Sequence, residues 1–260
     1  MFIADMKRKI KYVTTAVLDL ILPRTCITCG QRLIPDERYL CLECIMDMPL
    51  THFWERSHNP MADKFNGIIQ KALDADIPGR EPYAYAAALF SYRSEGSYRQ
   101  IPYQIKYHGN TAAGRYFGHM LGRKLSSSDF LKDVDVLIPV PLHWTRKWKR
   151  GYNQAEMIAE GAASAMNVPV RSDLLVRRRR TKTQTKLDID GKARNVENAF
   201  AVRSHALSPC QETFPFRHIL LIDDVFTTGS TLMACFTALR TVFPPGVRIS
   251  VATLGFVGEG

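Results

Sequence analysis

An unbroken apolar run, Ile219 to Ile222, leads directly into two adjacent carboxylates, Asp223 and Asp224. Runs this short, branched and free of charge are typical of strands buried on both faces of a parallel sheet. A helical pattern follows from Leu232 to Leu239, so the segment predicts a strand, a turn and a helix. Ligands of open α/β sheets bind at the carboxyl ends of the strands. We therefore expect both carboxylates at a binding site.

The turn before that helix is rich in hydroxyl groups and contains one glycine: Thr227, Thr228, Gly229, Ser230 and Thr231. Backbone N–H groups at a helix N-terminus favour an anion, and glycine allows close approach. Ionised carboxylates accept hydrogen bonds from a vicinal diol or help to hold a divalent cation. The alternative is a well-capped turn beside a solvated strand end. Two other phosphate motifs, G-x-x-x-x-G-K-[ST] and G-x-G-x-x-G, are absent, and the pattern favours a phosphorylated sugar.

A second buried strand is predicted over Asp135 to Val140, followed by a basic loop and a helix from about Gln154 to Met166. The loop holds no acidic residue, and its cations are Arg146, Lys147, Lys149 and Arg150. Cations this close repel one another unless an anion offsets them. We expect a polyanion there, the alternative being a solvated basic loop.

A third basic segment, Arg177 to Arg203, is polar until Ala199 and Phe200, which predicts a surface loop and then a short strand. It opens with four consecutive arginines, Arg177 to Arg180. In the second basic segment the aromatic residues Trp144, Trp148 and Tyr152 alternate with cations. Exposed aromatics among cations can stack unpaired bases, so single-stranded DNA is a possible partner. The alternative is that these rings pack beneath the loop.

The segment from Ile219 to Thr231 resembles the phosphoribosyl diphosphate (PRPP) motif of type I phosphoribosyltransferases. Together with the basic segments and IKYHG at Ile105 to Gly109, it resembles the ComF family, phosphoribosyltransferase-like proteins associated with bacterial DNA uptake. The resemblance covers most of Tyr85 to Val257. It implies a type I phosphoribosyltransferase-like α/β fold with a twisted parallel sheet, PRPP binding with Mg²⁺, and competence or DNA-uptake proteins as possible partners.

The resemblance also implies roles for individual residues. Asp223 and Asp224 would hold the ribose hydroxyls and, directly or indirectly, Mg²⁺, and Thr227 to Thr231 the 5′-phosphate. Thr183 to Asn195 would be a loop that closes over the site. Four side chains would contact or stabilise the diphosphate and its departure: Lys106, Arg146, Arg150 and Arg194, with Asn195 as a further contact.

Two C-x-x-C pairs, Cys26/Cys29 and Cys41/Cys44, are separated by eleven residues. Paired knuckles of this kind suit a tetrahedral Cys₄ zinc site. Disulfides or a redox dithiol are the alternatives, although neither a signal peptide nor a disulfide-dense domain is evident. Cys210 and Cys235 lack partners at ligand spacing and are expected to be structural, with Cys235 on a buried helix face.

The chain has 260 residues, 46% of them hydrophobic, which is sufficient for one α/β core and a small appendage. We expect a helix and zinc ribbon over 1–52, a linker over 53–82 and the phosphoribosyltransferase-like domain over 83–260. Ile10 to Leu22 is too short to span a membrane and carries an amphipathic pattern. A cytoplasmic protein is expected.

The formal net charge of +10 partly reflects the loops already assigned to an anionic sugar. Two functions therefore stay open: an enzyme that transfers phosphoribosyl from PRPP, and a non-catalytic PRPP or nucleotide sensor that holds single-stranded DNA. Only about thirty residues follow the PRPP-like motif. A pocket for the acceptor is expected from the ribbon or from Tyr85 to Gly109, and the sequence does not identify that acceptor.

Overall fold

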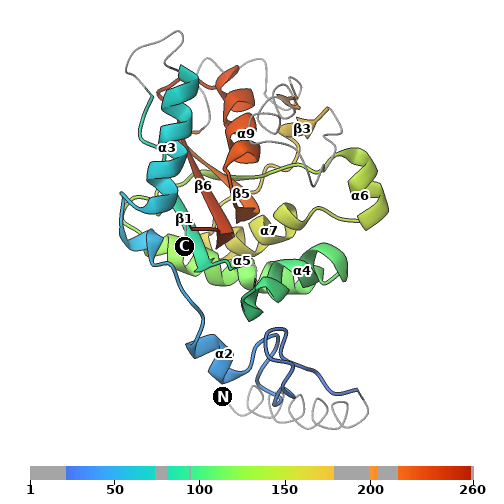
Figure 1. Cartoon of the computed structure of the whole chain (residues 1–260). Helices are drawn as coiled ribbons and strands as arrows, with labels where there is room; N and C mark the ends of the chain where they lie inside the picture. The colour runs from blue at the N-terminus through green and yellow to red at the C-terminus, as the bar shows by residue number, and fades with distance from the viewer. Residues whose placement is uncertain (1–21, 74–80, 94, 179–198, 204–215, 259–260) are drawn as a thin grey trace, which may run out of the picture.

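The computed structural model describes residues 22–73, 81–93, 95–178, 199–203 and 216–258. Its centre is a four-stranded parallel sheet in the order β1-β6-β5-β2 (Figure 1). The strands are β1 (Ala86–Ser91), β2 (Val136–Pro139), β5 (His218–Phe226) and β6 (Arg248–Phe256). This arrangement confirms the expected α/β class with a parallel sheet.

The predicted strand at Ile219 to Ile222 is the first half of β5, which continues beyond the two carboxylates to Phe226. The strand is longer than expected because β6 pairs with it along this extension, with Asp223 opposite Thr253. On its other side, the pairing with β2 ends where Pro139 faces Ile222. Asp223 and Asp224 therefore lie just beyond the end of β2, at the edge of the sheet where a ligand can approach.

Helices cover both faces of the sheet, and the structure also contains a separate short hairpin. The helices are α2 (Leu42–Met46), α3 (Pro60–Leu73), α4 (Gln100–Tyr107), α5 (Thr111–Ser126), α6 (Trp144–Arg150), α7 (Gln154–Met166) and α9 (Ser230–Arg240). Two short 3₁₀ helices are η1 (Phe53–Glu55) and η2 (Ser97–Arg99), and the antiparallel hairpin is β3 (Leu175–Arg177) with β4 (Phe200–Val202).

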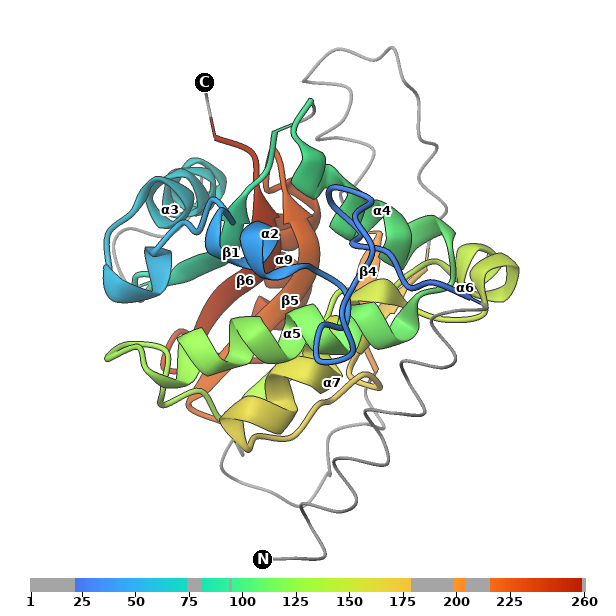
Figure 2. The same ribbon diagram turned by 90° about the horizontal axis from the view of Figure 1, so that it is seen from below.

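The two faces of the sheet bury alternate residues of each strand. Ile219 and Leu221 belong to the core under α3 and α9, whereas Leu220 and Ile222 belong to the core under α5 and α7. Figure 1 shows α3 and α9 above the sheet, and Figure 2 shows α5 and α7 across its opposite face. Burial on both faces explains why the strand sequence is apolar without alternation.

Helices α5 and α7 pack so closely that glycine is required at their crossing. A Cβ atom added to Gly161 would lie 2.1 Å from the carbonyl oxygen of Arg115, and one added to Gly118 would lie 2.2 Å from that of Ile158. Such distances are far below van der Waals contact. This tight helix pair supports the sheet next to β2 and β5, the strands that carry the site.

The segment 53–82, expected to be a linker, contains η1 and the 14-residue helix α3. Met61, Phe65 and Ile69 follow one helix face and are at most 1% exposed. Asn59 caps the helix, because its Oδ1 accepts hydrogen bonds from the backbone N–H groups of Met61 and Ala62. This apolar spacing was the signal missed in the sequence, and α3 is a part of the core rather than a connection.

The cysteine-rich segment, residues 22–46, packs against α5. The ring centroids of Tyr39 and Tyr116 are 5.0 Å apart, and Tyr98 Oη donates a hydrogen bond to the carbonyl of Cys44. Residues 1–21, including most of the expected amphipathic helix, lie outside the described residues. The domain boundaries at 52 and 82 therefore stay predictions. No helix in the described ranges is both long and apolar enough to cross a bilayer.

His218 begins β5 at the end of the sheet opposite the carboxylates, and its Nε2 lies 2.8 Å from Ser250 Oγ. Burial, assisted by the positive charge of Arg248, lowers the pKa of His218 to about 4. The unfolded chain, with a histidine pKa near 6.5, binds this proton first as pH falls. Stability should therefore decrease from about pH 6.5 down to pH 4.

For this single group the expected decrease in unfolding free energy is ~3 kcal/mol. Urea titrations at pH 7 and pH 4.5 measure it, and His218→Gln should be much less sensitive to pH. Equal pH dependence in both proteins would show that His218 is not responsible.

Candidate functional site

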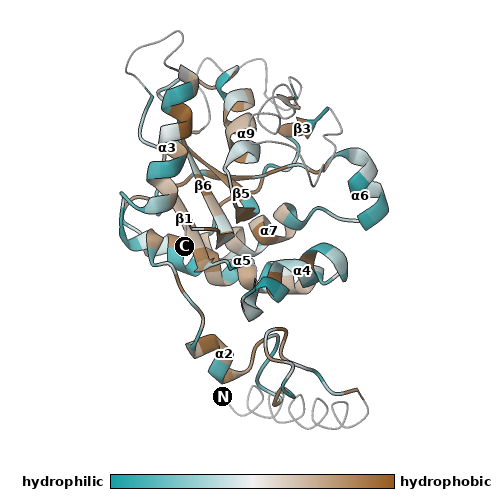
Figure 3. Ribbon diagram, viewed as in Figure 1, coloured by the Kyte–Doolittle hydropathy of each residue, from teal (hydrophilic) through white to brown (hydrophobic). Residues whose placement is uncertain are grey.

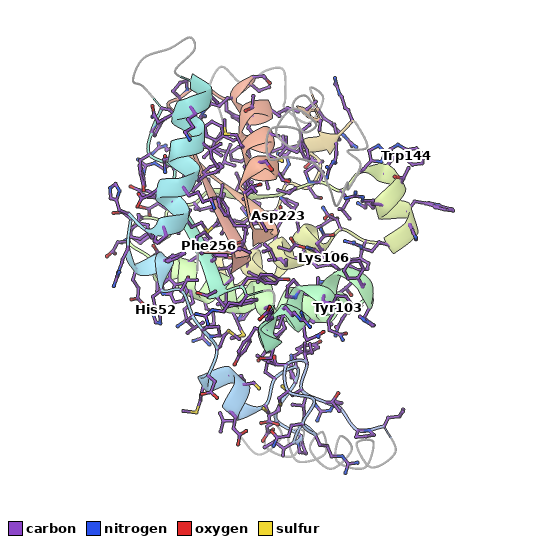
Figure 4. All side chains as sticks on the ribbon, in the orientation of Figure 1. His52, Tyr103, Lys106, Trp144, Asp223 and Phe256 are labelled. Atoms are coloured by element: carbon purple, nitrogen blue, oxygen red, sulfur yellow. The ribbon has the colours of Figure 1, made fainter. Side chains whose placement is uncertain are left out.

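A cleft of about 660 Å³ opens at the carboxyl ends of β2 and β5. Asp223 and Asp224 enter it from β5, and Lys106 enters it from α4, as Figure 4 shows for Asp223 and Lys106. The remaining charged lining residues are all cations: Arg146, Lys149, Arg150 and Arg177. The cleft thus brings two carboxylates together with a group of positive charges.

The basic segment after β2 is a helix, α6, and not the expected loop. Its N-cap is His143, whose Nδ1 accepts a hydrogen bond from the backbone N–H of Thr145, and it ends at Gly151. The sequence between them contains no glycine or proline, which was an available signal for a helix. Figure 3 colours most of α6 as hydrophilic. A helix fixes the relative positions of Arg146, Lys149 and Arg150 better than a loop would.

The two carboxylates differ in their surroundings. Burial, with the adjacent charge of Asp224, raises the pKa of Asp223 to about 7. Asp224 instead pairs with Lys106, whose Nζ lies 2.7 Å from its Oδ2. Although burial alone would lower the pKa of Lys106, the charge of Asp224 raises it. A ligand that donates hydrogen bonds or brings positive charge would stabilise the ionised form of Asp223.

The hydroxyl-rich turn follows the end of β5 and leads into α9, as the sequence predicted. Gly229 is the N-cap, with φ of +76°, and Thr228 Oγ1 lies 2.9 Å from Ser230 Oγ. A Cβ at position 229 would lie 2.9 Å from both Ile68 Cδ1 and Phe226 Cζ. The left-handed backbone of the turn therefore favours glycine, and a larger side chain would crowd Ile68 of α3 and Phe226.

Two arginines of the cleft lie close enough to repel each other. Burial, together with repulsion from Arg146, lowers the pKa of Arg177. The guanidinium of Arg177 also lies over the ring of Phe200, 5.1 Å from its centroid. An anion bound between these side chains would relieve the repulsion, which is what the run of cations in the sequence indicated.

Most of the predicted site residues lie together. The cleft is lined by six of them: Asp223, Asp224, Lys106, Arg146, Arg150 and Thr231. An adjoining hollow, which also touches Asp223, is lined by the other four: Thr227, Thr228, Gly229 and Ser230. Residues 179–198 lie outside the described residues, and with them Arg179, Arg180 and the expected closing loop, including Arg194 and Asn195. Sequence reasoning did not assign Arg177, Tyr107 or Gln154 to the cleft.

The aromatic residues of the second basic segment divide into two kinds. Trp144 and Trp148 on α6 are 70% and 86% exposed. Tyr152 is half-buried, lines the cleft, and donates a hydrogen bond to the carbonyl of Ile105. Of these three aromatic residues, Tyr152 alone packs against α4, and the two tryptophan rings are accessible to a partner.

The four N-terminal cysteines form a second candidate site. Their Sγ atoms lie within 4.8 Å of one another, and those of Cys29 and Cys41 are 3.7 Å apart. Tetrahedral zinc–thiolate bonds of ~2.3 Å place two sulfurs about 3.8 Å apart, so the spacing fits. Although burial opposes it, backbone N–H donors lower the pKa of Cys26 to about 7. The cluster can bind a metal ion, and Cys235 is buried in α9 as expected.

The sequence of the chain is similar to a competence protein and to a group of DNA utilization proteins. It is 37% identical over 110 residues to "Competence protein F" of Haemophilus influenzae, covering 42% of this chain and 46% of that protein. It is 36% identical over 98 residues to "DNA utilization protein YhgH" of Escherichia coli O157:H7, covering 38% of this chain and 40% of the relative, and the Salmonella typhi protein of that name is 35% identical over 98 residues.

The chain therefore aligns with less than half the length of these curated relatives. No protein-family model matches it. The likeness to competence protein F and to the YhgH proteins supports the resemblance to the ComF family that the motifs of the sequence indicated.

Proposed function

We propose that the protein binds PRPP together with Mg²⁺ and transfers its phosphoribosyl group with release of pyrophosphate. One observation carries the proposal: a single cleft sets Asp223 and Asp224 against the cations of α6, with a hydroxyl-rich helix N-terminus beside them. A ribose with a phosphate at one end and a diphosphate at the other has the complementary pattern of groups. The fold would accordingly be of the type I phosphoribosyltransferase class.

Each part of the cleft has a chemical task in this proposal. Asp223 and Asp224 would accept hydrogen bonds from the ribose diol, and Thr227 to Thr231 would donate to the 5′-phosphate. Arg146 and Arg150 would stabilise the charge that develops on the departing pyrophosphate. Carboxylate oxygens are suitable ligands for Mg²⁺, which would neutralise part of the diphosphate charge.

Lys106 has two proposed contacts, one with Asp224 and one with the diphosphate. Its side chain is 29% exposed and that of Asp224 is 7% exposed, so the ion pair is largely shielded from water. A diol that donates to Asp224 competes with Lys106 for the same oxygen. Lys106 would then be available to the diphosphate, because a lysine has a long stem and three donors.

Calorimetric titration with PRPP and Mg²⁺ tests binding, and pyrophosphate release in the presence of nucleobases tests transfer. Steady release identifies an enzyme. Tight binding without release identifies a sensor that uses the same cleft. Absence of PRPP binding contradicts both forms of the proposal.

The metal that we propose for the cysteine cluster is structural zinc, held by Cys26, Cys29, Cys41 and Cys44. The spacing of their sulfurs supports this assignment, as does the lack of a fifth ligand nearby among the described residues. A zinc ion bound here would link the segment that contains Cys26 and Cys29 to the start of α2, where Cys41 and Cys44 lie.

Single-stranded DNA is a second candidate ligand, favoured by the exposure of Trp144 and Trp148 next to Lys147 and Lys149. Names such as competence protein and DNA utilization protein among the relatives support a link to DNA uptake. Bases stacking on the tryptophans, with phosphates near the lysines, would give binding that is independent of sequence.

Trp148→Ala should weaken oligonucleotide binding by about 1 to 3 kcal/mol, because that is the usual contribution of one stacked base. The dependence of affinity on salt should hardly change, since stacking releases few counterions. Fluorescence anisotropy with a labelled oligonucleotide measures both quantities. Met46→Ala, which removes a side chain of similar exposure from α2, is the control. No binding of the wild-type protein at low salt would eliminate this second function.

A further inference from the structure

A groove of about 850 Å³ lies between the cysteine-rich segment, residues 22–46, and helix α5. Both sides contribute to its apolar lining: Ile34, Tyr39, Leu42, Ile45, Ala112 and Tyr116. In Figure 2 the chain of the cysteine-rich segment crosses α5. The groove shares no described lining residue with the cleft at the ends of β2 and β5. It is therefore a feature separate from the proposed PRPP site.

Exposed aliphatic side chains gather on the cysteine-rich segment. Ile34 and Leu42, which line the groove, are 61% and 63% exposed, and Leu22 and Met46 are each 77% exposed. These are all of the large aliphatic side chains that are exposed in the described ranges. Helix α2, which contains Leu42 and Met46, has no buried residue. Apolar side chains that gather in this way mark a surface that another segment or molecule covers.

The sequence before Leu22 contains an apolar stripe. Residues 1–21 lie outside the described residues, and their apolar side chains recur at alternating intervals of three and four: Ile3, Met6, Ile10, Val13, Val17 and Leu20. This spacing is typical of a helix with one narrow apolar face that packs against a partner surface. The pattern stops before Pro23, as a helix does.

The chain enters the cysteine-rich segment beside the groove. The backbone N–H of Leu33 donates a hydrogen bond to the carbonyl of Arg24, at 2.9 Å. The guanidinium of Arg24 donates to the carbonyls of Ile34 and Glu37, and both of these residues line the groove. The residues before Leu22 are thus tethered at the groove, and a short tether gives a segment of the same chain a high effective concentration there.

We propose that residues 3–20 form a helix that docks in this groove, with the stripe from Ile3 to Leu20 against the apolar lining. The charged residues around the groove have both signs, so apolar contact rather than net charge selects the occupant. The docked helix covers Ile34 and Leu42 and holds the cysteine-rich segment on α5. Because the groove and the cleft are separate, this docking does not depend on PRPP binding.

Photo-crosslinking of the full chain tests the docking directly. Benzoylphenylalanine in place of Val17, on the stripe, should crosslink within one chain to residues 34–45 or 112–119, as mass spectrometry of the monomer shows. The same probe in place of Thr15 is the matched control, because Thr15 lies on the opposite side of a helix from Val17. Crosslinks mainly between two chains, or an equal yield from both positions, would overturn the proposal.

Hydrogen exchange tests the docking from the side of the groove. Leu42→Asp should make the amide hydrogens of residues 3–20 exchange about tenfold faster or more, because it places a charge in the apolar lining. Leu42 is largely exposed, so the fold of the cysteine-rich segment should tolerate the change. Met46→Asp is the matched control, since Met46 is exposed on the same helix and does not line the groove.

Val17→Asp should raise the exchange of residues 3–20 to the same extent without altering the cysteine-rich segment. This second variant guards against local unfolding around Leu42. Exchange that is unchanged in Val17→Asp, or that rises equally in Met46→Asp and Leu42→Asp, contradicts docking in this groove.

Discussion

The double variant Asp223→Asn/Asp224→Asn is expected to bind PRPP about a hundredfold more weakly than the wild-type protein, or worse. Each hydrogen bond to a charged group contributes roughly 1.5 to 3 kcal/mol, and the proposal assigns one ribose hydroxyl to each carboxylate. Asparagine keeps the size of the side chain but lacks the negative charge that attracts the diol and the cation. Calorimetry with PRPP and Mg²⁺ measures the loss.

The fold should survive this substitution. Because burial raises the pKa of Asp223 to about 7, its ionisation costs stability as pH rises from the ordinary carboxyl pKa to that value, and the full cost remains at higher pH. At pH 8 a neutral amide in place of the Asp223 carboxylate therefore removes an unfavourable charge. The loss of Asp224 leaves Lys106 without its ion-pair partner, an effect in the opposite direction. Thermal unfolding at pH 8 should show a small net change, which separates lost binding from lost structure.

Asp129→Asn is the matched control for charge removal. Asp129 is highly exposed and pairs with Lys132 in the turn after α5. The substitution should leave PRPP binding unchanged, because exposed ion pairs contribute little and Asp129 lines neither the cleft nor the hollow beside it. Unchanged PRPP affinity in the double variant would mean that the ribose binds elsewhere.

The sequence predicted the elements whose signal is local. The apolar runs at Asp135 to Val140 and Ile219 to Ile222 correspond to β2 and β5, and the expected helix from Gln154 to Met166 is α7. These segments are buried on a defined face, so their hydrophobic pattern is clear. The cysteine spacing likewise predicted a cluster that the structure brings together.

Elements that depend on tertiary context were harder to predict. Helix α3 carries a polar face with several charges, and its short apolar stripe was obscured by the prolines and glycines on either side. Helix α6 has no buried residue, so it lacks the hydrophobic periodicity by which helices are recognised. Its caps, His143 and Gly151, were the remaining signals.

Some residues of the candidate cleft could likewise be predicted from local sequence, whereas others depend on tertiary packing. Motifs located the carboxylates, the turn and the cations of α6, because these residues are contiguous in the sequence. Arg177 comes from the β3–β4 hairpin and Tyr107 from α4, and no spacing rule connects either residue to β5. Their presence in the cleft follows from how the hairpin and α4 pack on the sheet, which a single sequence does not specify.

Cys41→Ser is expected to abolish binding of one zinc ion per chain and to unfold the knuckle over residues 22–46. Zinc sites of this kind contribute about 10 to 16 kcal/mol to local folding in small peptides, far more than a segment with so few buried residues supplies otherwise. Elemental analysis gives the zinc content, and hydrogen exchange gives the residues that lose protection. Chelation of the wild-type protein should give the same exchange pattern.

The sheet should remain folded in Cys41→Ser, although with reduced stability. Leu33 and Leu40 of the knuckle are buried in the same core cluster as Phe117 of α5, and Tyr39 packs on Tyr116. Cys235→Ser provides the control, because it perturbs an equally buried thiol in α9 that is not part of the cluster. That variant should lose stability and keep its zinc. A metal-free wild-type protein with a protected knuckle would show that packing on α5, and not zinc, holds this segment.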